Sequence, residues 1–162
     1  MINIKFIHPK FIPTWILIFL MRIGAWIPFK LQVILGRAIG KIIYPIMSKR
    51  RTTAYSNISH CFPEKKQNQV TLMVKQHFEA IGISLFETSN AYYGTDTKII
   101  KLLTIKNKHY FNDALKKEGG IILLCSHFMP LMLGSRALLI NNTIANIYRP
   151  QNNALFDQAM VK

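Results

Sequence analysis

Acidic residues are scarce in this sequence and are missing from its first third. Seven Asp and Glu stand against 21 Lys and Arg, which gives a formal net charge of +14, and the first carboxylate in the chain is Glu64. Half of the residues are nonetheless hydrophobic. A basic and apolar chain suits a partner that is both anionic and hydrophobic, such as a phospholipid or a phosphorylated lipid. We therefore expect a lipid partner and no nucleic acid, since no recognition motif for nucleic acid is present.

Cysteine is nearly absent, and motifs for metals and nucleotides are missing. Cys61 and Cys125 lack the spacing of metal ligands and cannot build a disulfide framework. The five histidines occur singly, and the chain contains neither a Gly-x-Gly-x-x-Gly pattern nor a P-loop. We expect no metal and no cofactor. The length of 162 residues allows one ordinary domain.

Residues 11–29 form an apolar run with a proline near each end. A helix of this length just spans the hydrocarbon core of a bilayer. Trp15 and Trp26 lie toward its two ends, where interfacial aromatic residues are favoured, whereas Arg22 near the middle would cost about 2.5–3.5 kcal/mol on insertion. The run is predicted to be a membrane-spanning or interfacial helix. A cleaved signal peptide is an alternative, although no small-x-small cleavage site follows convincingly.

The next segment, residues 30–46, has the pattern of an amphipathic helix. Lys30, Arg37 and Lys41 fall together on a flank of its apolar face. That face consists of Leu31, Ile34, Leu35, Ala38, Ile39, Ile42 and Ile46. It could lie in a membrane interface or pack on the protein's own core. Gly36 and Gly40 form a Gly-x3-Gly pair that would let another helix approach closely.

Three consecutive cations, residues 49–51, end this hydrophobic section and would suit an anionic membrane surface. Lys5 and Lys10 precede the first apolar run, so charge bias does not decide the orientation. We therefore divide the chain into membrane-spanning or interfacial helices over residues 1–47 and a second unit over residues 48–162.

The second unit alternates predicted helices and strands. Residues 68–93 are predicted to be a helix, with Phe78, Ile81, Leu85 and Phe86 on one buried face. A short helix over residues 110–117 precedes a predicted strand, Ile121–Cys125, and a second strand is predicted over residues 145–148. This order predicts an α/β fold, with a mixed sheet flanked by helices.

A histidine directly follows the first predicted strand. At that position His127 would lie at the mouth of a sheet, where an imidazole can act as a general base in acyl transfer. The alternative is that His127 merely caps the strand. Ser126 is not read as a nucleophile, because neighbouring strand residues point apart and no Gly-x-Ser-x-Gly elbow is present.

Several of these segments resemble the lipid A biosynthesis acyltransferases. Asn57-Ile58-Ser59-His60-Cys61-Phe62-Pro63-Glu64 is similar to that family's Asn-Leu-x-x-Cys-Phe-Pro-Glu element. Tyr148-Arg149-Pro150-Gln151-Asn152-Asn153 resembles its Tyr-Arg-Pro-x-Asn-Asn element. His127 stands where the family's His-x4-acid motif begins. The order and spacing of these pieces extend the resemblance over nearly the whole chain.

The resemblance implies a chemistry and a place in the cell. The family transfers a fatty acyl chain from acyl carrier protein to a hydroxyl of a phosphorylated glucosamine lipid, at the cytoplasmic face of the bacterial inner membrane. His127 would be the general base, and an acid five residues later would orient its imidazole. The resemblance makes Arg136, Arg149 and Asn152 candidates for binding the substrate.

Two departures from the family pattern lead us to expect impaired activity. Met132 occupies the position of the acid, and its thioether cannot balance an imidazolium charge; Asp113 and Glu118 are the nearest acids in sequence. The family also continues for roughly as much chain again, so residues 48–162 are expected to be a partial, truncated His-x4-acid acyltransferase domain. The alternative is a non-catalytic, membrane-bound remnant that binds anionic lipid.

Overall fold

The computed structural model describes residues 4–117, 120–145 and 148–161. Two short 3-10 helices, Ile4–Ile7 and Pro9–Phe11, begin this part of the chain. Eight α-helices follow in it: α1 (Ile12–Trp26), α2 (Phe29–Ile46), α3 (Ser48–Cys61), α4 (Gln67–Tyr93), α5 (Asp96–Leu102), α6 (Lys108–Leu115), α7 (Leu131–Leu139) and α8 (Ala154–Met160).

The predicted α/β fold is wrong, because the described residues contain helices and no strand. Ile121–Cys125 has no regular secondary structure, and the side chains of Ile122 and Leu124 are 99% and 100% exposed. A strand needs a neighbour to accept and donate its backbone hydrogen bonds, and this part of the chain supplies none. The second predicted strand, residues 145–148, has its two middle residues outside the described ones.

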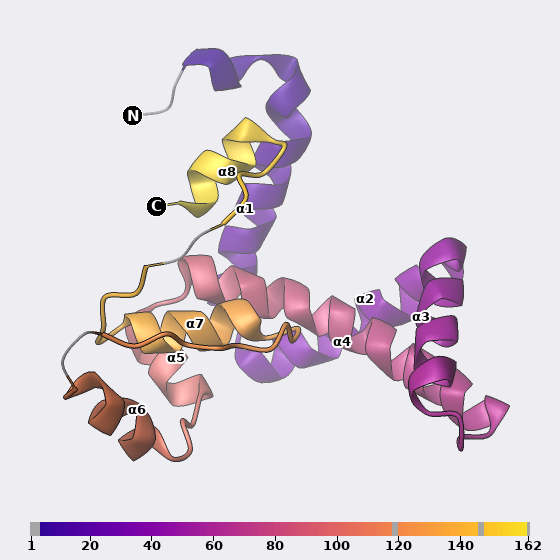
Figure 1. Ribbon diagram of the computed structural model, residues 1–162. Helices are drawn as coiled ribbons and strands as arrows, with labels where there is room; N and C mark the ends of the chain where they lie inside the picture. Colours follow the sequence, from indigo (N-terminus) through magenta and orange to yellow (C-terminus); the bar gives the residue numbers. More distant parts are fainter. Residues whose placement is uncertain (1–3, 118–119, 146–147, 162) are drawn as a thin grey trace.

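Helix α4 forms the axis on which the other long helices pack. Helices α1 and α2 both pack against it, α3 contacts its N-terminal part, and α7 packs near its C-terminal end (Figure 1). The prediction of a helix over residues 68–93 is confirmed, and the helix ends where Gly94 follows it. Phe78 is buried as expected, whereas Leu85 is half exposed, because the packed face is narrower than the periodicity suggested.

The closest backbone contact joins α2 to α4 through glycines. A Cβ atom on Gly36 would lie 2.6 Å from the Cα of Ile83, and one on Gly82 would collide with the carbonyl oxygen of Gly36. Gly40 faces the backbone of Phe78 in the same way. The prediction that the Gly-x3-Gly pair admits another helix is therefore confirmed.

A buried pair of amides lies where α1, α2 and α4 meet. The Nδ2 of Asn90 donates to the Oε1 of Gln32 at 2.7 Å, and the Nε2 of Gln32 donates back at 3.3 Å. The same Nε2 also donates to the carbonyl of Gly24 at 2.7 Å. Both side chains are fully buried, so these bonds fix how the first two helices meet α4.

The first apolar run is helical but shorter than predicted. Helix α1 ends at Trp26, and α2 begins at Phe29 after a two-residue break, Ile27 and Pro28. Within the described residues, no single helix has both the length and the apolar composition to cross a membrane. Helices α2 and α3 meet that test only as a pair, and the chain bends by 99° between them.

Two small cores hold the elements that carry the predicted site. Phe6, Ile18 and Leu155 cluster where α8 packs on α1. Leu133 packs against Ala91 and Ile99, which holds α7 on α4 and α5. The His127 region and the segment before α8 are thus supported by different parts of the molecule.

Candidate active site

His127 lies in an exposed turn that leads into α7. The backbone N–H of Phe128 donates to the carbonyl of Ser126 at 3.0 Å, and the N–H of Leu131 donates to the carbonyl of Phe128 at 3.1 Å. The described residues form no sheet, so the prediction that His127 lies at a sheet edge is wrong. His127 instead lies four residues before the start of α7. Across residues 4–117, 120–145 and 148–161, the imidazole has no hydrogen-bond partner, and it faces solvent.

Met132 is the second residue of α7 and is exposed beside this turn. The first turn of α7 contains no acidic residue. A helix N-terminus stabilises a carboxylate, so the family's acid would stand here in a favourable field. A thioether carries no charge and accepts hydrogen bonds only weakly. This end of α7 therefore holds a candidate base without the group that would orient it.

Of the two acids closest in sequence, Asp113 does not replace the missing group. The carboxylate of Asp113, on α6, lies 2.9 Å from the Nζ of Lys116, the residue after that helix. Glu118 lies outside the described residues. Among the described residues, no acid therefore pairs with His127 in place of the one that Met132 lacks.

Arg136 is one helical turn beyond Met132 and pairs with Asp96 at the start of α5. The guanidinium is partly shielded and the carboxylate is about half exposed. A phosphate could bind Arg136 only by sharing its N–H groups with Asp96 or by displacing that carboxylate. The role of Arg136 in binding substrate stays a prediction.

Arg149 and Asn152 are both exposed and precede α8. Helix α8 packs on α1, whereas α7 packs on α4 and α5 (Figure 1). The predicted site residues therefore form two groups, one beside α7 and one before α8. Neither the open depression along α3 nor the one at the start of α4 is lined by any of these residues.

Asn153 has a structural role that the sequence reading missed. Its Oδ1 accepts from the backbone N–H groups of Leu155 and Phe156, both at 3.1 Å, and its Nδ2 donates to the Oγ1 of Thr14 at 2.7 Å. Asn153 thus caps α8 and ties it to α1. An asparagine directly before a helix is a recognised N-cap signal. Because a strand was predicted before Asn153 and no helix after it, this signal was not recognised.

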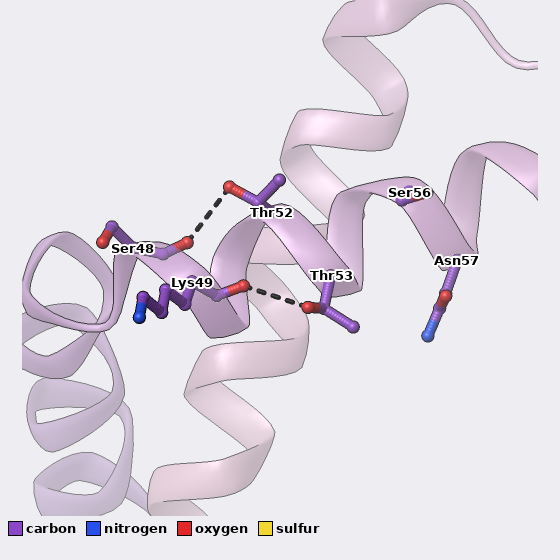
Figure 2. A pocket seen from close by; sticks show the side chains of 6 residues that line it. All are labelled: Ser48, Lys49, Thr52, Thr53, Ser56 and Asn57. Atoms are coloured by element: carbon purple, nitrogen blue, oxygen red, sulfur yellow. Dashed lines mark hydrogen bonds between the residues drawn. The ribbon is translucent and has the colours of Figure 1, made fainter.

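An open depression with polar lining residues runs along α3. Its volume is about 520 Å³, and Figure 2 shows its lining residues, Ser48, Lys49, Thr52, Thr53, Ser56 and Asn57. The hydroxyls of Thr52 and Thr53 donate to carbonyls of their own helix, at 3.2 and 3.0 Å. Figure 1 places α3 and α7 toward opposite ends of α4, so this depression is separate from His127.

Comparison with known proteins identifies the family. A family model described as bacterial lipid A biosynthesis acyltransferase matches residues 2–162. The chain is 29% identical to the lipid A biosynthesis lauroyltransferase of Escherichia coli strain K12, covering 93% of this chain and 49% of the relative. It is 27% identical to the palmitoleoyltransferase of the same organism, covering 94% and 50%, and 25% identical to a lipid A biosynthesis acyltransferase of Haemophilus influenzae, covering 94% and 49%.

The chain spans about half the length of these curated relatives, and no solved structure matches it. The family model nevertheless matches nearly every residue, from residue 2 to residue 162. The chain therefore belongs to the bacterial lipid A biosynthesis acyltransferase family.

Proposed function

We propose that this chain takes part in transferring a fatty acyl group from acyl carrier protein to a hydroxyl of a phosphorylated glucosamine lipid. The family match over residues 2–162 carries the proposal, and relatives named as lauroyl- and palmitoleoyltransferases support a fatty acyl group as the cargo. The basic and apolar composition fits a phosphorylated lipid acceptor at the cytoplasmic face of the inner membrane.

In this proposal the imidazole of His127 takes the proton from the acceptor hydroxyl. The hydroxyl oxygen attacks the thioester carbonyl, the C–S bond breaks, and the carrier's thiol leaves with the proton that the imidazolium returns. Arg136, Arg149 and Asn152 are the proposed contacts for the acceptor's phosphates, with Arg136 released from Asp96 as the phosphate binds. No metal or redox cofactor enters this scheme.

We also propose that Met132 impairs the reaction. In serine proteases, replacing the aspartate that orients the catalytic histidine by asparagine lowers kcat by about 10⁴. The thioether of methionine is an even weaker hydrogen-bond acceptor for an imidazolium than an amide oxygen is. The expected result is a slow enzyme whose remaining rate depends on His127 alone.

A direct test measures acyl transfer to the lipid acceptor by mass spectrometry. The chain is joined to the part of the E. coli lauroyltransferase that its match leaves uncovered and is assayed in detergent with acylated carrier protein. We expect a low yield of acylated lipid that is lost in His127→Ala and kept in His109→Ala, a control at an exposed histidine on α6. An equal yield from His127→Ala and the unaltered chain would contradict the proposed base.

A second candidate function is that of a non-catalytic membrane protein that binds anionic lipid. The neutral side chain at Met132 and the exposed apolar faces of the first helices favour it. Binding to lipid vesicles without any acyl product, in both the unaltered chain and Met132→Glu, would support this alternative over acyl transfer.

A further inference from the structure

Helix α6 stands apart from the packed helices. It contains no buried residue, and within the described part of the chain no other helix packs extensively on it. It follows α5 after a short linker, residues 103–107, whose last residue, Asn107, turns the chain with a left-handed backbone at φ 55°. Asparagine tolerates this conformation better than most residues do. The outer side of α6 is therefore left to solvent or to a partner.

The outer side of α6 is polar and basic. Lys108 and Asn112 in the helix and Lys116 directly after it recur every four residues, so they share one face, and all three are exposed. Between residues 101 and 117 the sequence has five lysines and one carboxylate, Asp113. That carboxylate is already paired, since it lies 2.9 Å from the Nζ of Lys116. The field around this helix is therefore positive.

Exposed apolar side chains accompany these cations. Tyr110, on the helix, is 70% exposed, and Ile105, in the linker before it, is 41% exposed. Interfaces between proteins combine such aromatic and aliphatic contacts with a polar, charged rim. We call the following residues the α6 surface: Ile105, Lys106, Lys108, Tyr110, Lys116 and Lys117.

The α6 surface lies at the end of the molecule that carries His127. Helix α5, which leads into α6, packs on α7, and Arg136 of α7 pairs with Asp96 at the start of α5. Figure 1 shows α5, α6 and α7 at one end of α4, with α3 at the other end. A partner bound to the α6 surface is therefore placed on the same side of the molecule as the candidate base.

A second basic surface, on α3, lies too far from His127 to serve the same reaction. Lys49 and Arg50 are exposed there, whereas Arg51 donates to the carbonyl of Tyr44 at 3.1 Å and lies over its ring. Helix α4 separates the two ends of the molecule, and its 27 residues correspond to about 40 Å. The α3 surface therefore serves as a matched control for the α6 surface.

We infer that the α6 surface docks the acyl carrier protein that donates the acyl group, an inference that rests on the proposed function. The carrier is a small acidic protein, so its charge complements the lysines of this surface. An anionic bilayer suits the surface less well, because an interfacial helix needs a broad apolar face and α6 turns lysines and an amide outward. The docked carrier remains outside the site while its flexible prosthetic arm brings the thioester to His127.

The affinity of the full chain for fluorescently labelled acyl carrier protein, measured by anisotropy in detergent, tests the surface. We expect Lys106→Glu combined with Lys108→Glu to raise the Kd about tenfold, because like charges then face each other. The same change of charge on α3, Lys49→Glu combined with Arg50→Glu, should alter the Kd by less than about twofold.

Two single substitutions refine this comparison. Tyr110→Ala removes the exposed aromatic contact, and we expect it to raise the Kd about fivefold. His109→Ala leaves the formal charge of α6 unchanged and should keep the affinity of the unaltered chain. Since α6 buries no residue, none of these variants should unfold the protein, and circular dichroism checks this.

Kinetics of the chain joined to the same part of the E. coli lauroyltransferase separate docking from chemistry. We expect the paired α6 substitutions to raise the KM for the acylated carrier about tenfold and to leave kcat within about twofold. No measurable carrier binding by the unaltered chain, or an equal Kd for the α6 and α3 pairs, would overturn the inference. Weaker binding of the α6 pair to anionic vesicles with unchanged carrier affinity would overturn it too. Carrier binding that depends on the α6 surface but yields no acylated lipid would uphold the docking surface and count against acyl transfer only.

Discussion

The amide side chains of Gln32 and Asn90 are buried where three helices meet, and they hydrogen-bond to each other. Asn90→Ala would leave the Gln32 amide without this partner in a site that water does not reach. We expect a loss of about 1–3 kcal/mol in the free energy of unfolding. Denaturant titration followed by circular dichroism measures it, with Gln76→Ala on the exposed side of α4 as the control. A cost no larger than that of the control would contradict a stabilising role for the pair.

Asn153 connects the family's Tyr-Arg-Pro-x-Asn-Asn element to α1. Asn153→Ala removes the cap of α8 and the bond to Thr14, and we expect it to destabilise α8 by about 1–2 kcal/mol. Asn152→Ala, at the exposed neighbour, should have no effect on stability. Hydrogen exchange at the amides of α8 compares the two variants. Equal protection in both would show that Asn153 does not hold the helix.

The carboxyl group of Glu87, on α4, makes the stability of the fold depend on pH. Burial raises the pKa of its carboxyl above the ordinary 4.5, so the folded state holds the proton more tightly than the unfolded state. The contribution of Glu87 to stability is therefore lost as pH rises above about 4.5 and through the folded pKa. We expect Glu87→Gln to remove this fall from thermal melts recorded across that range. A profile unchanged by the substitution would contradict the assignment.

At the scale of elements, glycine has opposite effects in two helices. A Cβ on Gly82 would collide with the backbone of α2, so Gly82→Ala should destabilise the fold by about 1–3 kcal/mol. Gly134, inside α7, has open space around the same position, and Gly134→Ala should stabilise the helix by about 0.5–1 kcal/mol. Melting temperatures of the two variants test the pair. A similar effect of both substitutions would mean that the close approach of α2 and α4 does not constrain Gly82.

The long helices α2 and α4 could be predicted from sequence, whereas the predicted sheet is wrong because the described residues contain no strand. Helical periodicity and flanking prolines and glycines are local signals, and they placed α2 and α4 within one residue of their observed bounds, whereas α1 is shorter than predicted. The apolar run Ile121–Cys125 carries no information about its pairing partner. In the described residues it lies exposed and unpaired, so composition alone suggested a sheet that this part of the chain does not form.

At the scale of the whole molecule, the sequence identified the family and the motif but not the geometry. The positions of His127 and Met132 follow from their spacing, because a turn and the start of α7 keep them close along one segment. The pairing of Arg136 with Asp96 and the structural use of Asn153 depend on contacts between distant segments, and no local pattern reveals such contacts. The division of the chain at residues 47 and 48 stays a prediction.

The proposed reaction depends on a histidine base, His127, that stands without an orienting acid at position 132. The most direct measurement compares the yield of acylated lipid from the unaltered chain, from Met132→Glu, and from Met132→Glu combined with His127→Ala, all joined to the same part of the E. coli lauroyltransferase. We predict that Met132→Glu raises the rate by about 10²–10⁴ and that adding His127→Ala abolishes the gain. No gain from Met132→Glu, or a gain that survives His127→Ala, would contradict it.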